Sequence, residues 1–175
     1  PTLLMTNSVN YPPTISNCVC LFNKILLDSH QIFYRDGLRF SEDLLFGAQA
    51  MYYANSFFYM KNNYYYHYMY NPTSVTNVFY KNKWMIMKQL HLEIEKFFLF
   101  LKDYNFQRQV DLVLLFIVYH CIDNIKTSDL DKKIKEKEIK NILENIDVCN
   151  MFSRIKINSL NISWKLKIIT FIYKY

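Results

Sequence analysis

Glycine is almost absent from this chain, which has only two glycines among 175 residues. Loops that wrap the phosphates of a nucleotide need several closely spaced glycines, because only a residue without a side chain lets the backbone approach so closely. The chain therefore has no G-x-G-x-x-G or P-loop fingerprint, and it is not collagen-like or a Gly-rich linker. If the protein handles a nucleotide, we expect the phosphates to be held in another way, or by residues outside this chain.

The rest of the composition favours a folded domain in a reducing compartment. Hydrophobic residues make up 51% of the chain and aromatic residues 18%, which is enough to bury a core. The length fits one domain, or one domain with a small appendage. Four cysteines form no C-x-x-C pair, and we expect them to be buried thiols. No basic and apolar leader is present, so we expect a cytoplasmic location.

The net charge of +6 is confined to the second half of the chain. Residues 1–80 carry four basic and four acidic side chains, and no acidic residue follows Asp147. The basic residues after Asp147 are Arg154, Lys156, Lys165, Lys167 and Lys174. A basic, apolar tail suits an anionic membrane surface or an anionic polymer, although a solvated helix face is an equally good interpretation.

The hydrophobic pattern divides the chain into an α/β part, 1–80, and a helical part, 81–175. In the first part we expect a helix that begins at Ser41 and short aromatic strands over 57–60 and 64–70, with a turn at 61–63 between them. In the second part, apolar residues recur at helical spacing over 84–101 and 106–121. Further helices are expected after Ser128 and after Ser163, both of which are candidate N-caps.

Glu42 and Asp43 are the best candidates for chemistry. They sit in the expected first helical turn, beside a turn at Arg35-Asp36-Gly37, where a carboxylate can face a cleft and accept a proton from a hydroxyl nucleophile. The competing interpretation is that they only stabilise the helix N-terminus, which is the commoner role of acidic residues there.

His67 is the candidate metal ligand, and a hydrogen-bonded structural histidine is the competing interpretation. It lies in a tyrosine-rich block that includes Tyr64, Tyr66 and Tyr70. These rings favour aromatic packing over a stacking platform for single-stranded nucleic acid, because few basic residues lie among them. Sugar stacking on an exposed tyrosine is a third interpretation, and we expect no nucleic-acid partner.

Several short motifs occur in one order over 20–76. They are Leu21-Phe22-Asn23-Lys24, Ile32 with Phe33 and Tyr34, Gly37-Leu38 with Phe40, Glu42-Asp43-Leu44-Leu45-Phe46, the aromatic segments 55–60 and 64–66, and Ser74-Val75-Thr76. In this order and spacing the chain resembles the second half of the catalytic domain of a family 2 glycosyltransferase, which has the GT-A fold.

The resemblance implies an inverting sugar transfer from a nucleotide sugar to a hydroxyl acceptor. Asp43 would be the catalytic base, Glu42 would help shape the acceptor site, and Mg²⁺ or Mn²⁺ would stabilise the leaving diphosphate. His67 and Tyr70 both match the family's metal-side position. The acceptor would be a glycan or a lipid-linked sugar in the assembly of cell-surface polysaccharide, capsule or lipopolysaccharide, with the basic helical part peripheral on the inner membrane face.

The chain also departs from the family. It lacks a D-x-D motif in the family's place, because Asp129-Leu130-Asp131 follows the Glu42-Asp43 pair and sits at an expected helix start. We therefore expect a donor-binding half upstream and a chain that is inactive alone. The alternative function is a non-catalytic, membrane-peripheral helical binding module.

Overall fold

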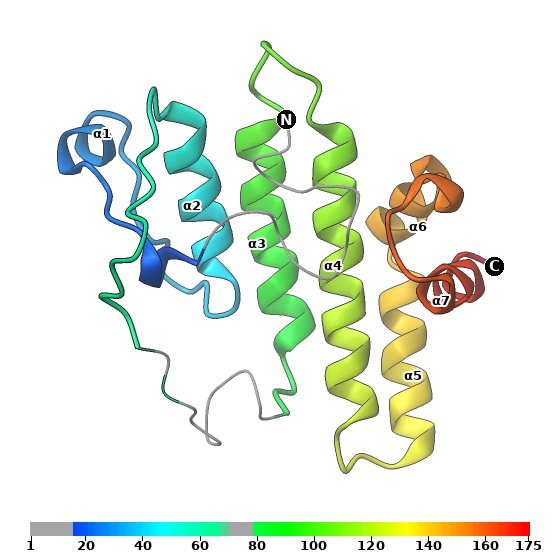
Figure 1. Cartoon of the computed structure of the whole chain (residues 1–175). Coiled ribbons are helices and arrows are strands. Elements are labelled where there is room, and N and C mark those ends of the chain that lie inside the picture. The colour runs from blue at the N-terminus through cyan, green and yellow to red at the C-terminus, as the bar shows by residue number, and fades with distance from the viewer. Residues whose placement is uncertain (1–15, 68, 70–78) are drawn as a thin grey trace.

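Helices are the regular secondary structure in the part of the chain described by the computed structural model, which covers residues 16–67, 69 and 79–175. The α-helices are α1 (Lys24–Ser29), α2 (Glu42–Tyr53), α3 (Lys83–Phe98), α4 (Gln107–Lys126), α5 (Lys132–Leu143), α6 (Ile146–Arg154) and α7 (Trp164–Lys174). Short 3-10 turns, η1 (Asn17–Val19) and η2 (Ile157–Ser159), complete the order. Helices α2 to α5 lie side by side, with α1 beyond α2 and with α6 and α7 beyond α4 (Figure 1).

Helix α4 forms the centre of the core. Fourteen of its twenty residues are buried, and they occupy every side of the helix. A helix that is apolar all round needs neighbours all round. Helix α4 has them, because α3, α5 and α6 all pack against it. The amphipathic helix α3 buries Met87, Leu90, Ile94 and Phe98 on its side of this core.

The predicted helices of the second part are confirmed, and their ends follow from local chemistry. Helix α5 begins after Asp131, whose side chain accepts a hydrogen bond from the backbone N–H of Lys133 at 2.8 Å. Helix α7 begins after Ser163, whose hydroxyl accepts from the N–H of Leu166 at 3.4 Å. The predicted cap at Ser163 is therefore confirmed, whereas the predicted cap at Ser128 is wrong, because Asp131 caps α5.

The predicted α/β fold, and with it the GT-A architecture, is wrong for the described residues, which contain helices and no strand. The predicted strands over 57–60 and 64–67 do not form, because these residues belong to no strand or helix. The turn at Lys61-Asn62 does form, with Asn62 in the left-handed region at φ 64°. Residues 68 and 70–78, including Tyr70 and the Ser74-Val75-Thr76 motif, lie outside the described residues.

Aromatic content misled the strand prediction. Strand propensity measures how well a side chain packs on a pleated, half-buried surface, so it needs a neighbouring strand or helix to take effect. Here Phe58 is 89% exposed and Tyr64 is 81% exposed, so these rings have no such surface.

The expectation of buried thiols was only partly met, because Cys121 is buried whereas Cys18 and Cys149 are exposed.

One core joins the two predicted parts of the chain. Phe40, Leu44, Leu45 and Ala48, from the first part, belong to the same buried cluster as α3 and α4. The start of α2 is therefore held in place by the helical part that follows it. The boundary at residue 80 stays a prediction.

We expect Ile117→Ala to lower the free energy of unfolding by about 3 kcal/mol, because it leaves a cavity in the fully buried centre of α4. Met85→Ala, on an exposed α3 position, should change it by less than about 0.5 kcal/mol. Urea denaturation of both variants measures this difference. Equal effects would contradict the placement of α4 at the centre of the core.

Candidate functional site

The start of α2 has a strained backbone. Ser41, the residue before the helix, is in the left-handed conformation with φ 54° and ψ 26°. This conformation is uncommon for a residue other than glycine and costs about 1 kcal/mol or more. The position of the predicted helix start is correct, but the predicted cap is not, because the Ser41 side chain makes no capping hydrogen bond. Strain of this kind is concentrated at functional sites.

Glu42 and Asp43 have different surroundings at this helix start. Glu42 is half-buried, and burial raises the pKa of its carboxyl, with the neighbouring charge of Asp43 adding to the rise against an opposing backbone hydrogen bond. Asp43 is exposed to solvent. Burial makes Glu42 a stronger proton acceptor than an exposed glutamate, while Asp43 is directly accessible to a ligand.

Asn17 ties the N-terminal 3-10 turn to this site. Its side-chain Nδ2 donates to the backbone carbonyl of Asp43 at 3.2 Å and to the Tyr34 hydroxyl at 2.9 Å. The Tyr34 ring stacks on Phe46 of α2, with ring centres 4.5 Å apart. The Asn17 Oδ1 atom is buried without a hydrogen-bond partner among the described residues. An exposed carboxylate, a tyrosine hydroxyl and an unpaired amide oxygen therefore lie around the first turn of α2.

The predicted metal ligand belongs to a different segment of the chain from these carboxylates. His67 is exposed on the extended segment that follows the turn at residue 61. Within the described residues, no three His, Cys, Asp or Glu side chains come close enough to hold a metal ion. The Mg²⁺ or Mn²⁺ that the resemblance implies, with its main ligands outside this chain, and the role of His67 stay predictions.

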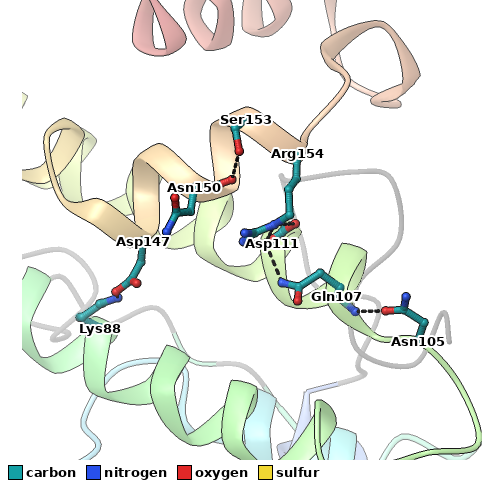
Figure 2. Close-up of polar contacts among 8 residues, drawn as sticks. All are labelled: Lys88, Asn105, Gln107, Asp111, Asp147, Asn150, Ser153 and Arg154. Carbon is teal, nitrogen blue, oxygen red and sulfur yellow. Dashed lines mark hydrogen bonds and ion pairs between the residues drawn. The ribbon is translucent and has the colours of Figure 1, made fainter.

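A second polar cluster, which the sequence analysis missed, fastens α6 to the core (Figure 2). Arg154 of α6 grips Asp111 of α4 with two nitrogens, at 2.6 Å from Nη2 to Oδ1 and 2.9 Å from Nε to Oδ2. At the other end of α6, Asp147 forms an ion pair with Lys88 of α3. We call these four residues the α6 clamp.

His91 of α3 is buried near the α6 clamp, with 3% of its surface exposed. Neither ring nitrogen makes a hydrogen bond of good geometry, although the Val110 backbone is close. Burial and, to a smaller extent, the positive charge of Lys88 lower the pKa of His91 to about 4, against the opposing effects of Asp147, Asp111 and the Val110 backbone. His91 is therefore neutral at pH 7.

An open depression of about 440 Å³ lies beside the α6 clamp. Its lining comes from the start of α4 and the end of α6: Tyr104, Asn105, Gln107, Arg108, Asp111, Arg154 and Ile155. Both guanidinium groups are already engaged, because Arg154 binds Asp111 and Arg108 donates to the Ser159 hydroxyl at 3.0 Å. The cluster acts as a fastening between helices, and the depression includes neither Glu42 nor Asp43.

Sequence reasoning had little chance of finding the α6 clamp. Its partners are 43 and 59 residues apart in the chain, and each charged residue by itself looks like an ordinary helix-surface residue.

Comparison with protein-family models, with curated proteins and with solved structures found no match to this chain. The start of α2 and the surfaces of the helices must therefore be interpreted from their own chemistry. None of the helices in the described part of the chain has both the length and the apolar character needed to cross a bilayer.

We expect Ser41→Gly to raise the free energy of unfolding by about 0.5 kcal/mol, because glycine accepts a positive φ and no capping bond is lost. Asn145→Gly is the control, since Asn145 caps α6 through its side chain at φ −62°, and it should lose stability. Urea denaturation compares the two. A loss of stability in Ser41→Gly would contradict the strain at this position.

Acid should lower the free energy of unfolding, because His91 is protonated more readily in the unfolded state than in the native state. Its lowered pKa means that the native state binds fewer protons than the unfolded state between about pH 6.5 and pH 4. The stabilising contribution is complete above pH 6.5 and falls by about 3 kcal/mol as the pH drops through this window. Chemical denaturation at several pH values measures the slope.

His91→Leu should flatten this pH dependence, while His67→Gln, which changes an exposed histidine, should keep the wild-type slope. The account of His91 would be contradicted if His91→Leu lost as much stability between pH 6.5 and pH 4 as the wild-type protein does.

Proposed function

We propose that this chain supplies the acceptor side of an inverting sugar transferase that acts in cell-surface polysaccharide or lipopolysaccharide assembly. The observation that carries the proposal is the carboxylate pair Glu42-Asp43 behind the strained Ser41, with Asp43 open to solvent. The order of short motifs around the pair, given above, supports the same function. The proposal rests on these residues and not on the α/β fold, which the structure contradicts.

In the proposed reaction, the hydroxyl oxygen of the acceptor attacks the anomeric carbon of a nucleotide sugar. The bond from that carbon to the diphosphate oxygen breaks, the configuration inverts, and the hydroxyl proton passes to the Asp43 carboxylate. An alcohol is a poor nucleophile at neutral pH, so a positioned base accelerates the attack. The Mg²⁺ or Mn²⁺ that the resemblance implies would stabilise the leaving diphosphate when bound, and we expect its main ligands outside this chain.

Glu42 and the Tyr34 hydroxyl are the groups we assign to acceptor positioning. Sugars present several hydroxyl groups that both donate and accept hydrogen bonds, so a half-buried carboxylate and a phenol near the base suit them. The nucleotide-sugar donor, with its diphosphate, is expected to bind residues outside this chain, since the start of α2 carries negative charge.

The competing hypothesis is that Glu42 and Asp43 only stabilise the N-terminus of α2. Acidic residues in a first turn contribute about 0.3–1 kcal/mol by this effect. A non-catalytic module would need nothing more from them. Substitution of Asp43 separates the two hypotheses, because only the transferase loses turnover.

In the complete protein, we expect Asp43→Asn to lower sugar transfer by about a hundredfold or more, while nucleotide-sugar binding is unchanged. Transfer of radiolabelled sugar from UDP-glucose, UDP-galactose, UDP-N-acetylglucosamine and GDP-mannose to a membrane lipid extract measures turnover. Asp36→Asn, in the exposed turn before α2, is the matched control and should transfer normally. Retained turnover in Asp43→Asn, with only a small loss of stability, would contradict the proposal.

A further inference from the structure

Helix α7 is fixed in one orientation on the rest of the protein. Thr170, fully buried, forms a hydrogen bond with the hydroxyl of Tyr119 from α4, and that hydroxyl also donates to the Leu166 carbonyl at 3.2 Å. The Lys126 ammonium donates to the Tyr173 hydroxyl at 2.9 Å. Leu166, Thr170 and Tyr173 thus form the inward face, and the opposite face of α7 points away from the core.

That outward face is apolar. Five large side chains along it are exposed by 49% to 84%: Trp164, Ile168, Phe171, Ile172 and Tyr175. Their spacing of i, i+4, i+7, i+8 and i+11 places them in one stripe along the helix. We call these five residues the α7 stripe. Isolated exposed apolar residues are ordinary, but a continuous stripe on a fixed helix marks a binding surface.

Lysines border the α7 stripe on both sides. Lys165 lies two helical turns before Ile172 and therefore on the same edge of the stripe as Ile172. Lys167 and Lys174 lie on the opposite edge, beside Phe171. Lys167 and Lys174 donate to the backbone carbonyls of Asn158 and Ile155, at 3.4 and 3.5 Å. A carbonyl partner holds each ammonium at the border of the stripe without neutralising its charge.

The charges of these lysines are not paired in salt bridges within the described residues. The sequence has no acidic residue after Asp147, and no ion pair joins Lys156, Lys165, Lys167 or Lys174 to a carboxylate in the described part of the chain. The C-terminal end of the protein, labelled beside α7 in Figure 1, therefore combines an apolar strip with positive charge.

We propose that the α7 stripe docks on a membrane surface that contains anionic lipid. A helix with an apolar stripe edged by lysines lies in the headgroup region of a membrane. Its apolar side chains reach the boundary with the acyl chains, and its ammonium groups contact the lipid phosphates. Trp164 and Tyr175, at the two ends of the stripe, are residues that favour this interface. The aliphatic Ile168 and Ile172 suit lipid chains, whereas a nucleic-acid surface would use rings and cations alone. The proposal is independent of the sugar transfer proposed above.

Co-sedimentation of the complete protein with vesicles tests the proposal. One set contains phosphatidylcholine alone, and the other contains about one third phosphatidylserine. We expect binding to the second set, weakened by salt, and weaker by at least about tenfold in the double variant Ile168→Ser with Phe171→Ser. Met85→Ser, which alters an exposed apolar residue on α3, is the control and should bind normally.

A single charge substitution keeps the test informative if the double variant fails to fold. Lys165→Gln, on the exposed border, should weaken binding about fivefold, whereas Lys137→Gln, exposed on α5, should change it less than about twofold. Quenching of tryptophan fluorescence by brominated lipid should occur in the wild-type protein and be lost in Trp164→Phe.

Equal binding to both sets of vesicles, or no effect of the α7 variants, would overturn the proposal. So would absence of vesicle binding together with a dimer that the double variant dissociates, because the stripe would then be an interface between two copies. Asp43→Asn should bind vesicles like the wild-type protein, so failure of the membrane proposal and failure of the transferase proposal can be told apart.

Discussion

The burial of α4 on all sides is the constraint on which the rest of the structure depends. A helix with apolar residues around its whole circumference is stable in water only inside a shell of other elements. Helices α3, α5 and α6 provide that shell. The one carboxylate that α4 buries deeply, Asp111, accepts hydrogen bonds from two nitrogens of Arg154, so its oxygens are not left without partners.

Both surfaces for which we propose functions are positioned from this centre. The start of α2 is anchored by Leu44 and Leu45, which pack into the same core as α4. Helix α7 is anchored by Tyr119, which projects from α4 to Leu166 and Thr170. The carboxylate pair and the α7 stripe are thus both attached to the same core around α4.

Local pattern was sufficient to predict α3 and α4, because Met87, Leu90 and Ile94 repeat at the helical period and meet a core on that face. It also located the cap at Ser163. It failed where the outcome depends on distant partners. The aromatic segment around Phe58 and Tyr64 has strand propensity but no neighbour to pair with, and the clamp pair Asp111–Arg154 joins residues far apart in the chain. At the candidate site, Glu42 and Asp43 were proposed from the sequence and stay predictions, whereas the strain at Ser41 and the contact from Asn17 needed the structure.

Hydrogen–deuterium exchange along the complete chain tests the central role of α4 most directly. If α4 is the enclosed centre, its amides over 112–122 should exchange only by global unfolding, with a free energy equal to that from urea denaturation. The amides of the exposed segment 56–66 should exchange far faster. Exchange of the α4 amides through local opening, at rates like those of the outer helix α5, would contradict the account.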